Sequence, residues 1–197
     1  MRIFGLSLPS RLALAALSGA LSQPTILLGE VLDRIAAPPI LEWWVILHGV
    51  LFGALVMTPF ILSQSQVAVR TTAMIIASVL AYLAAIELPD IIGLPFGGEV
   101  GAFSQAGVIG AVLVAIAVRI IAPLKIHTRY WGLTLLAGAI GGAIFSQTFG
   151  VCVLDSCESL AEFVAHSFGW VAWQMLVCAA LWLGVRHDRQ DIVSAGV

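Results

Sequence analysis

The amino-acid sequence predicts an all-α, polytopic integral membrane protein with six transmembrane helices arranged as three helical hairpins. Of its 197 residues, 60% are hydrophobic and only 10% are charged, and the mean hydropathy is +1.05. A soluble domain carries about 25% charged residues, and a soluble fold of this size could not bury so much apolar surface. The composition also excludes a disordered chain, which would be rich in charge and poor in apolar residues.

Six apolar stretches free of Asp, Glu, Lys and Arg supply the helices. A span of about 20 residues crosses the hydrocarbon core of a bilayer, and backbone groups in lipid must bond within their own helix. The third stretch is short, so we expect Arg70 and Glu87 to snorkel at its ends. Pro24 and Pro59 are expected to kink or locally open the first two helices. The stretches are 12–29, 43–63, 71–86, 100–118, 130–154 and 163–185.

These stretches form one membrane domain, residues 1–197, whose orientation follows from its basic residues. Eight of the nine Lys and Arg residues fall on one side of a six-span topology, and only Arg34 falls on the other. The positive-inside rule makes that side cytoplasmic, with both termini inside. The hairpins are 11–63, 70–122 and 129–186, followed by a short cytoplasmic tail, 187–197.

A bacterial inner membrane is the expected location, because the chain has no Asn and a single Lys against eight Arg, which fits a GC-rich bacterial genome. An alternative for the first span is a cleaved signal peptide, since Arg2 and Arg11 precede it and small residues follow the apolar run. The repeat described next favours retention of this span.

The hairpins carry the signs of an internal repeat. Arg11, Arg70 and Arg129 follow one another at intervals of 59 residues, and each opens an outward-going helix. The first two outer loops, 30–42 and 87–99, share five of thirteen residues without a gap, while the third loop has diverged. We interpret the pattern as three units related by a pseudo-three-fold axis. Coincidence in a biased composition is the alternative.

The outer side is acidic, with nine of the eleven Asp and Glu residues. Glu42 and Glu99 each begin a returning helix, and Glu162 stands four residues before His166. A crowded carboxylate surface concentrates cations and can bind a hard divalent ion. The alternative is a solvated rim, in which the acids at helix starts simply favour the positive end of the helix dipole.

Two histidines lie just inside the membrane. His48 and His166 are 118 residues apart, twice the repeat interval, and Gln105 occupies the position equivalent to His48 in the second unit. An ionisable residue at membrane depth is a functional candidate. These three side chains are expected to form a polar ring for a proton, a metal or a small polar solute. The alternative is interfacial histidines bonded to backbone or headgroups. The candidate binding residues are His48, Gln105, His166, Glu42, Glu99 and Glu162.

The cysteines favour a local disulfide. Cys152 and Cys157 both fall in the third outer loop, on the oxidising periplasmic side of the proposed topology. A redox-active pair is the alternative, although the spacing is not Cys-x-x-Cys. Cys178 lies within the sixth span and is expected to act as a small apolar residue.

Three hypotheses for function follow. The first is a transporter, channel or membrane solute-binding subunit that moves or binds a small solute or cation through an acidic outer mouth. The second is a non-catalytic accessory or assembly subunit of a larger membrane complex, with lateral contacts and no cavity. The third, a membrane enzyme or redox protein, is the least favoured, because the chain has no Gly-x-Ser-x-Gly, His-Glu-x-x-His or phosphate-binding loop.

The expected partner is the lipid bilayer, with a homo-oligomer or a larger membrane complex as further options. A net charge of −2 without a basic stripe argues against nucleic acid. The sequence specifies no catalytic residue, no metal and no cofactor.

Overall fold

A computed structural model of the chain describes residues 6–35, 43–61, 66–92, 98–122, 128–149 and 160–194. This part of the chain contains six α-helices and no strand, which confirms the all-α prediction. The helices are α1 (Leu8–Ile35), α2 (Trp43–Phe52), α3 (Val67–Ile92), α4 (Gly98–Ile121), α5 (Thr128–Phe149) and α6 (Leu160–Ser194).

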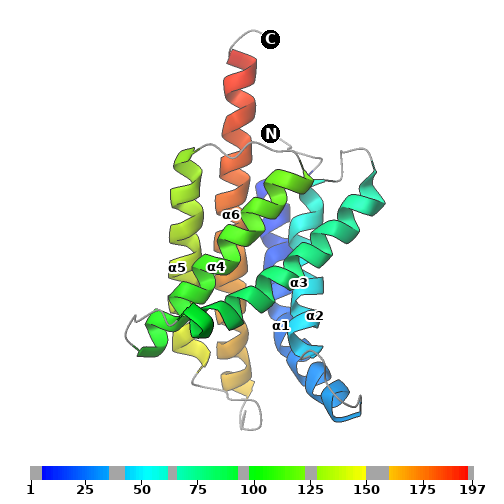
Figure 1. The fold of residues 1–197 in the computed structure, drawn as a ribbon, viewed down its shortest axis with the longest axis vertical. Coiled ribbons are helices and arrows are strands. Elements are labelled where there is room, and N and C mark those ends of the chain that lie inside the picture. The colour runs from blue at the N-terminus through cyan, green and yellow to red at the C-terminus, as the bar shows by residue number, and fades with distance from the viewer. Residues whose placement is uncertain are drawn as a thin grey trace.

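The helices form an up-and-down bundle that closes on itself. Each helix packs against the next in the chain, and α6 returns to pack against α1. The chain alternates in direction, so that the start of α1 and the end of α6 lie at the same end of the bundle (Figure 1). The hairpin of α3 and α4 crosses the bundle obliquely, whereas α5 and α6 run closer to its long axis. Short connections between antiparallel neighbours are typical of this topology.

Within the described residues, three helical segments are long and apolar enough to cross a membrane. They are Val67–Pro89, Gly98–Ile121 and Phe163–Val185, and a shorter apolar stretch covers Val45–Phe60. Large apolar side chains also lie on the outside of the bundle, including Leu80, 59% exposed, and Phe168, 59% exposed. An apolar outer surface of this kind is compatible with a membrane protein.

The second helix changes its winding before Pro59. After Phe52 the chain forms a π-helix, η1 (Gly53–Met57), and then a 3-10 turn, η2 (Thr58–Phe60). Proline has no backbone N–H and crowds the preceding turn, so a regular α-helix cannot run through it unchanged. The backbone N–H and the hydroxyl of Thr58 both donate to the carbonyl of Gly53. The predicted opening at Pro59 is therefore confirmed.

The first helix responds differently to its proline. α1 stays α-helical from Leu8 to Ile35 with Pro24 inside it. Its C-terminal part turns outward from the bundle (Figure 1). Of the two outcomes expected at Pro24, a kink or a local opening, the opening is absent, because α1 is continuous through the proline.

Two arginines donate hydrogen bonds to backbone carbonyls at the end of the following helix. The side chain of Arg11, at the start of α1, is 1% exposed and donates to the carbonyl of Pro59 at 2.9 Å. Its guanidinium also lies 4.4 Å from the centre of the Phe60 ring. Arg70, in the first turn of α3, donates to the carbonyl of Ile121, the last residue of α4. Each cation meets carbonyls at the C-terminal end of a helix, where the dipole favours positive charge.

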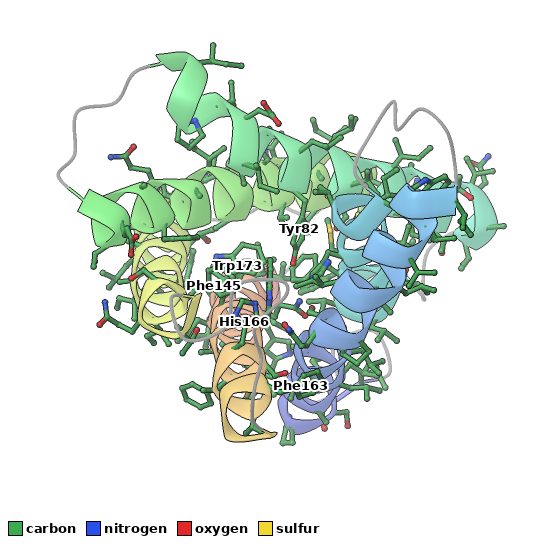
Figure 2. All side chains as sticks on the ribbon, turned by 90° about the horizontal axis from the view of Figure 1, so that it is seen from below. Tyr82, Phe145, Phe163, His166 and Trp173 are labelled. Atoms are coloured by element: carbon green, nitrogen blue, oxygen red, sulfur yellow. The ribbon has the colours of Figure 1, made fainter. Side chains whose placement is uncertain are left out.

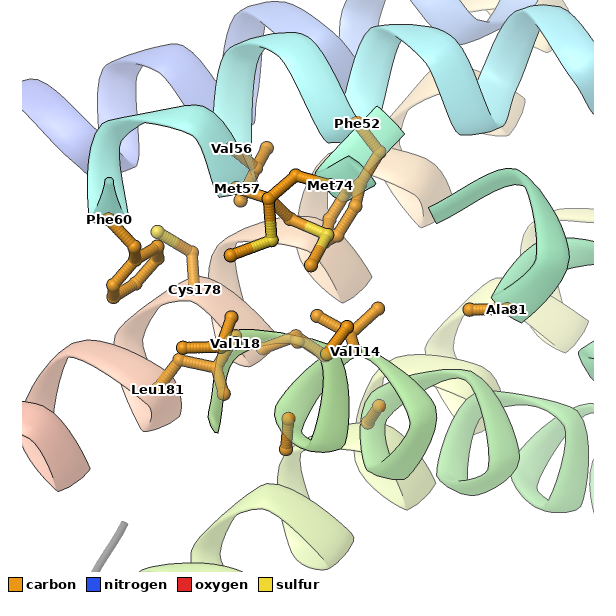
Figure 3. Close-up of a cluster of buried hydrophobic side chains, with 14 of the residues drawn as sticks. Phe52, Val56, Met57, Phe60, Met74, Ala81, Val114, Val118, Cys178 and Leu181 are labelled. Carbon is orange, nitrogen blue, oxygen red and sulfur yellow. The ribbon is translucent and has the colours of Figure 1, made fainter. Parts of the chain in front are cut away.

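The core near these arginines is a dense apolar cluster. Figure 3 shows Phe52, Met57, Met74 and Val114 packed between α2, η1, α3 and α4, with Cys178 of α6 beside them. Cys178 is a free, buried thiol. It lies in the apolar cluster, where a small apolar residue was expected, and its Sγ also donates to the carbonyl of Arg11 at 3.9 Å.

Glycines bring the successive pairs of helices together. A Cβ added to Gly19 of α1 would lie 2.5 Å from the Cα of Val171 in α6, and one added to Gly49 of α2 would lie 2.5 Å from the Cα of Val79 in α3. Gly107 of α4 and Gly138 of α5 face each other with their backbones in contact. The packing role predicted for the small residues is confirmed at these three seams.

Candidate functional site

His48 is the buried histidine of α2. Its side chain has no exposed surface, and its Nδ1 lies 3.5 Å from the hydroxyl of Thr25 in α1. Its ring centre is 4.5 Å from that of Trp170 in α6 and 6.1 Å from that of Tyr82 in α3. Four helices therefore converge on this imidazole.

Beside His48, a buried glutamine joins three helices. Gln174 of α6 has no exposed surface, and its Nε2 donates to the hydroxyls of Ser22 in α1 and Tyr82 in α3, each at 3.4 Å. Ser22 in turn donates to the carbonyl of Ser18. Such side-chain bonds between helices satisfy polar groups that would otherwise be buried in an apolar medium. We call Ser22, Thr25, His48, Tyr82 and Gln174 the polar cluster.

His166, in the first turns of α6, is separated from His48 by the rings of Phe145 and Trp170. Its side chain is 2% exposed and lies against the backbone of Thr148 in α5. Its ring lies 5.5 Å from Phe145, which lies 4.5 Å from Trp170, which contacts His48. The two predicted histidines are thus linked through two aromatic rings. Figure 2 shows Tyr82, Phe145, His166 and Trp173 gathered in the interior of the bundle.

A pocket of about 320 Å³ opens between α3, α4, α5 and α6 next to these rings. Five of its twelve lining residues are aromatic, and six of the others are alanine or glycine, whose small side chains leave space between the helices. None of the described residues that line it is charged. The aromatic residues are Tyr82, Phe103, Phe145, Trp170 and Trp173; the others are Ala81, Ala85, Ile86, Ala106, Gly107, Gly110 and Gly142.

The remaining predicted site residues lie elsewhere. Gln105 is half-buried on α4, and its Nε2 has no hydrogen-bond partner among the described residues, but it does not line the pocket. Glu99 is exposed in the first turn of α4. The structure brings His48 and His166 close to the pocket wall without making them part of it.

The other candidates fall outside what the structure describes. Glu42, Cys152 and Cys157 lie outside the described residues, and so does the side chain of Glu162. Within the described part of the chain, no group of three or more His, Cys, Asp or Glu side chains is arranged to hold a metal ion.

Sequence reasoning overlooked the residues that build the pocket and the polar cluster. Gln174 and Tyr82 carry one signal that was available, because each places a polar group in the middle of an apolar span. The aromatic residues gave no comparable signal, since Trp and Phe are common throughout membrane helices. Their importance comes from four helices meeting, which no local pattern shows.

Comparison with known proteins identified no relative of this chain. Models of protein families, curated protein sequences and solved structures all give no match to this chain. The fold and the site define a helical bundle of membrane-compatible character with an apolar internal pocket beside a polar cluster.

Proposed function

We propose that this chain is a small multi-pass inner-membrane protein that binds or moves a small molecule within its bundle. The observation that carries this proposal is the pocket of about 320 Å³ lined by four helices. Ligand pockets are typically concave, largely apolar and few per protein, and helix bundles build them between helices. A subunit whose only role is lateral contact has no need of such a space.

The proposal includes six spans in three related hairpins, with both termini in the cytoplasm. The arginine contacts support the hairpin repeat, since Arg11 and Arg70 stand one repeat interval apart and each binds a carbonyl at the end of its own hairpin. The basic residues give the orientation.

In this topology the pocket lies in the outer half of the bundle. Ile86 and Phe145 stand near the ends of outward-going helices, and Phe103 and Trp170 near the starts of returning ones. The exposed carboxylates of Glu87 and Glu99 lie at the same end. We propose that these acids form an outer mouth that attracts cationic or polar solutes electrostatically, while the pocket itself accepts the less polar part of a ligand.

The test is purification of the full chain from its native membrane in a mild detergent, followed by native mass spectrometry. We expect the wild-type protein to carry a small-molecule adduct. Ala106→Leu fills the pocket and should remove the adduct. Ala102→Leu, the same change at an exposed position one turn earlier on α4 that does not line the pocket, should keep it.

Two results would overturn the proposal. One is an adduct that Ala106→Leu leaves unchanged, since the molecule would then sit elsewhere on the protein. The other is a wild-type chain without an adduct that elutes in stoichiometric amounts with a larger protein complex. That outcome would replace the proposal with the accessory-subunit hypothesis.

A further inference from the structure

The surface that faces the pocket is almost entirely hydrocarbon, although three of the lining side chains carry a polar atom. The indole of Trp173 donates to the backbone carbonyl of Gly107 at 3.4 Å, and the hydroxyl of Tyr82 is bonded to Gln174. The indole nitrogen of Trp170 is itself buried. The residues that the structure describes therefore offer an occupant almost no polar surface, which disfavours ions, water and polar molecules alike.

The lining of the pocket follows α4 for two turns. Phe103, Ala106, Gly107 and Gly110 have the spacing i, i+3, i+4 and i+7, so they form one strip of the helix, about 10 Å long at ~1.5 Å per residue. Alanines of α3 and a glycine of α5 line the same space. A strip of small residues between aromatic rings suits a narrow, flexible chain that lies along the helix.

In the proposed topology the pocket lies at the depth of the lipid acyl chains. Trp173 stands about ten residues, or roughly 15 Å, into the apolar segment Phe163–Val185, close to its middle. The pocket is open on one side, and Ile86, nearer the outer end of the bundle, is a lining residue that is also exposed. Leu80 and Ile91 of the same helix are exposed as well. The surface beside the opening is therefore apolar.

An apolar space of this size is unfavourable to leave empty. At about 320 Å³ it equals on the order of ten methylene groups, if each takes about the ~30 Å³ of a water molecule. Water finds almost no polar partner there, and atoms that line a void lose their dispersion contacts. A hydrocarbon chain fills the space without burying a polar group, and the bilayer supplies such chains at the same depth.

We infer that this pocket holds one hydrocarbon chain of a bilayer lipid, which enters at the surface beside Ile86 and leaves the lipid head group at the outer interface. This inference rests on the proposed function and names the ligand class of the same pocket. The small molecule of that function is then an amphiphile that the protein holds by its acyl chain.

Tryptophan fluorescence tests this occupant directly, because bromine quenches an indole only at close range. The full chain is placed in nanodiscs of phosphatidylcholine with brominated acyl chains and, in parallel, in nanodiscs of the same lipid without bromine. The reporter protein keeps Trp173 alone, which is only 7% exposed and lines the pocket. The five other tryptophans, each replaced by phenylalanine, are Trp43, Trp44, Trp131, Trp170 and Trp182.

A second reporter protein, which keeps Trp182 alone, is the matched control. Trp182 lies on the same helix and is 5% exposed, but it does not line the pocket. We expect the brominated lipid to remove most of the fluorescence of the Trp173 protein and little of that of the Trp182 protein. Ala106→Leu or Ala85→Leu, added to the Trp173 protein, fills the pocket and should restore its fluorescence, while Ala102→Leu should not.

Three results would overturn the inference. The first is an unquenched Trp173, which is also the result expected if a second copy of the polypeptide covers the opening. The second is equal quenching of Trp173 and Trp182. The third is quenching that persists when Ala85→Leu and Ala106→Leu are both folded, because the bromine then acts from outside the pocket. Gel filtration identifies any variant that fails to fold. If neither filling variant folds, the comparison of Trp173 with Trp182 decides.

These outcomes are distinct from failure of the proposed function. If Trp173 is not quenched, the ligand class is wrong. The proposed function still stands in that case when the protein from native membranes carries an adduct that Ala106→Leu removes.

Discussion

The glycine contact between α4 and α5 differs in kind from the polar cluster, which links α6 to α1 and α3 beside the contact of Gly19 with Val171. Between α4 and α5, Gly107 and Gly138 bring two backbones together, and Gly142 does the same against Phe103. In the polar cluster, Gln174 of α6 donates long hydrogen bonds of 3.4 Å to Ser22 of α1 and to Tyr82 of α3. The α4–α5 contact depends on the absence of side chains, whereas in the polar cluster side chains reach across from one helix to another.

This difference shows the two ways in which helices associate when the surroundings are apolar. Lipid removes the hydrophobic reason for two helices to approach, so close packing and hydrogen bonds between helices must hold them together. Packing of backbone against backbone has no freedom to adjust. A side-chain hydrogen bond at long range can shift or be replaced. Substitutions should therefore be far more damaging at the glycine seam than in the polar cluster.

The largest effect is expected from Gly107→Ala. The new methyl would collide with the backbone of Gly138, so α4 and α5 must separate. We expect a loss of about 2–3 kcal/mol in the free energy of unfolding, typical of overpacking a rigid contact. Unfolding of the purified protein by SDS in mixed micelles, followed by circular dichroism, gives the value.

Gly132→Ala is the matched control on α5. A Cβ added at Gly132 meets nothing within 4 Å. Alanine is the better helix former by up to about 1 kcal/mol, so this variant should be neutral or slightly stabilised. The same chemical change is thus expected to have opposite signs at two positions of the bundle. A Gly107→Ala protein as stable as Gly132→Ala would refute rigid packing at the seam.

The glycine seam also shows what the sequence could and could not predict. Small-residue spacing indicated close helix packing, and apolar stretches gave the helices, because both are local patterns with a direct physical cause. Which helix each glycine meets was not available from the chain. Gly110, for instance, faces Trp173 of α6 rather than a neighbouring glycine. Pairing depends on how tilted helices cross, and that is set by the whole bundle.

The second-largest effect on stability is expected at Arg11 and Arg70, which lie at the opposite end of the bundle from the histidines. Arg11→Met keeps a long apolar stem but removes the hydrogen bond to the carbonyl of Pro59 and the contact with Phe60. Hydrogen bonds to charged groups contribute about 1.5–3 kcal/mol, so we expect a loss of about 2 kcal/mol. Arg70 is only half-buried, and water can replace its contact, so Arg70→Met should cost less, about 1 kcal/mol.

Arg119→Met serves as the control, because Arg119 is exposed on the last turn of α4. Its free energy of unfolding should stay within about 0.5 kcal/mol of the wild-type value. A rise in stability for Arg11→Met would mean that burying the guanidinium costs more than its contacts return. If Arg70→Met lowered the free energy of unfolding more than Arg11→Met does, burial would not determine which of the two contacts contributes more.

The candidate site was predicted less well than the fold, for a reason visible in its residues. His48 and His166 stood out because an ionisable group in an apolar span is rare, and the structure buries both. The acids were selected by their side of the membrane, which says nothing about where a cavity forms. The pocket depends on Phe145, Trp170 and Trp173 meeting from two helices, and sequence spacing within one helix carries no information about that meeting.

The smallest effect is expected in the polar cluster, and it needs a double-mutant cycle to be seen. Ser22→Ala removes one acceptor of Gln174, and Gln174→Leu removes the donor from both of its bonds. Hydrogen bonds between membrane helices average about 0.6 kcal/mol in such cycles, so we expect a coupling free energy near that value between the two positions. Thr72→Ala provides the unrelated partner, because Thr72 is exposed on α3 and bonds only within its own helix; its coupling to Gln174→Leu should be zero within error. A Ser22–Gln174 coupling free energy above about 2 kcal/mol would be as large as the loss expected at the glycine seam. The contrast between adjustable polar contacts and rigid backbone packing would then fail.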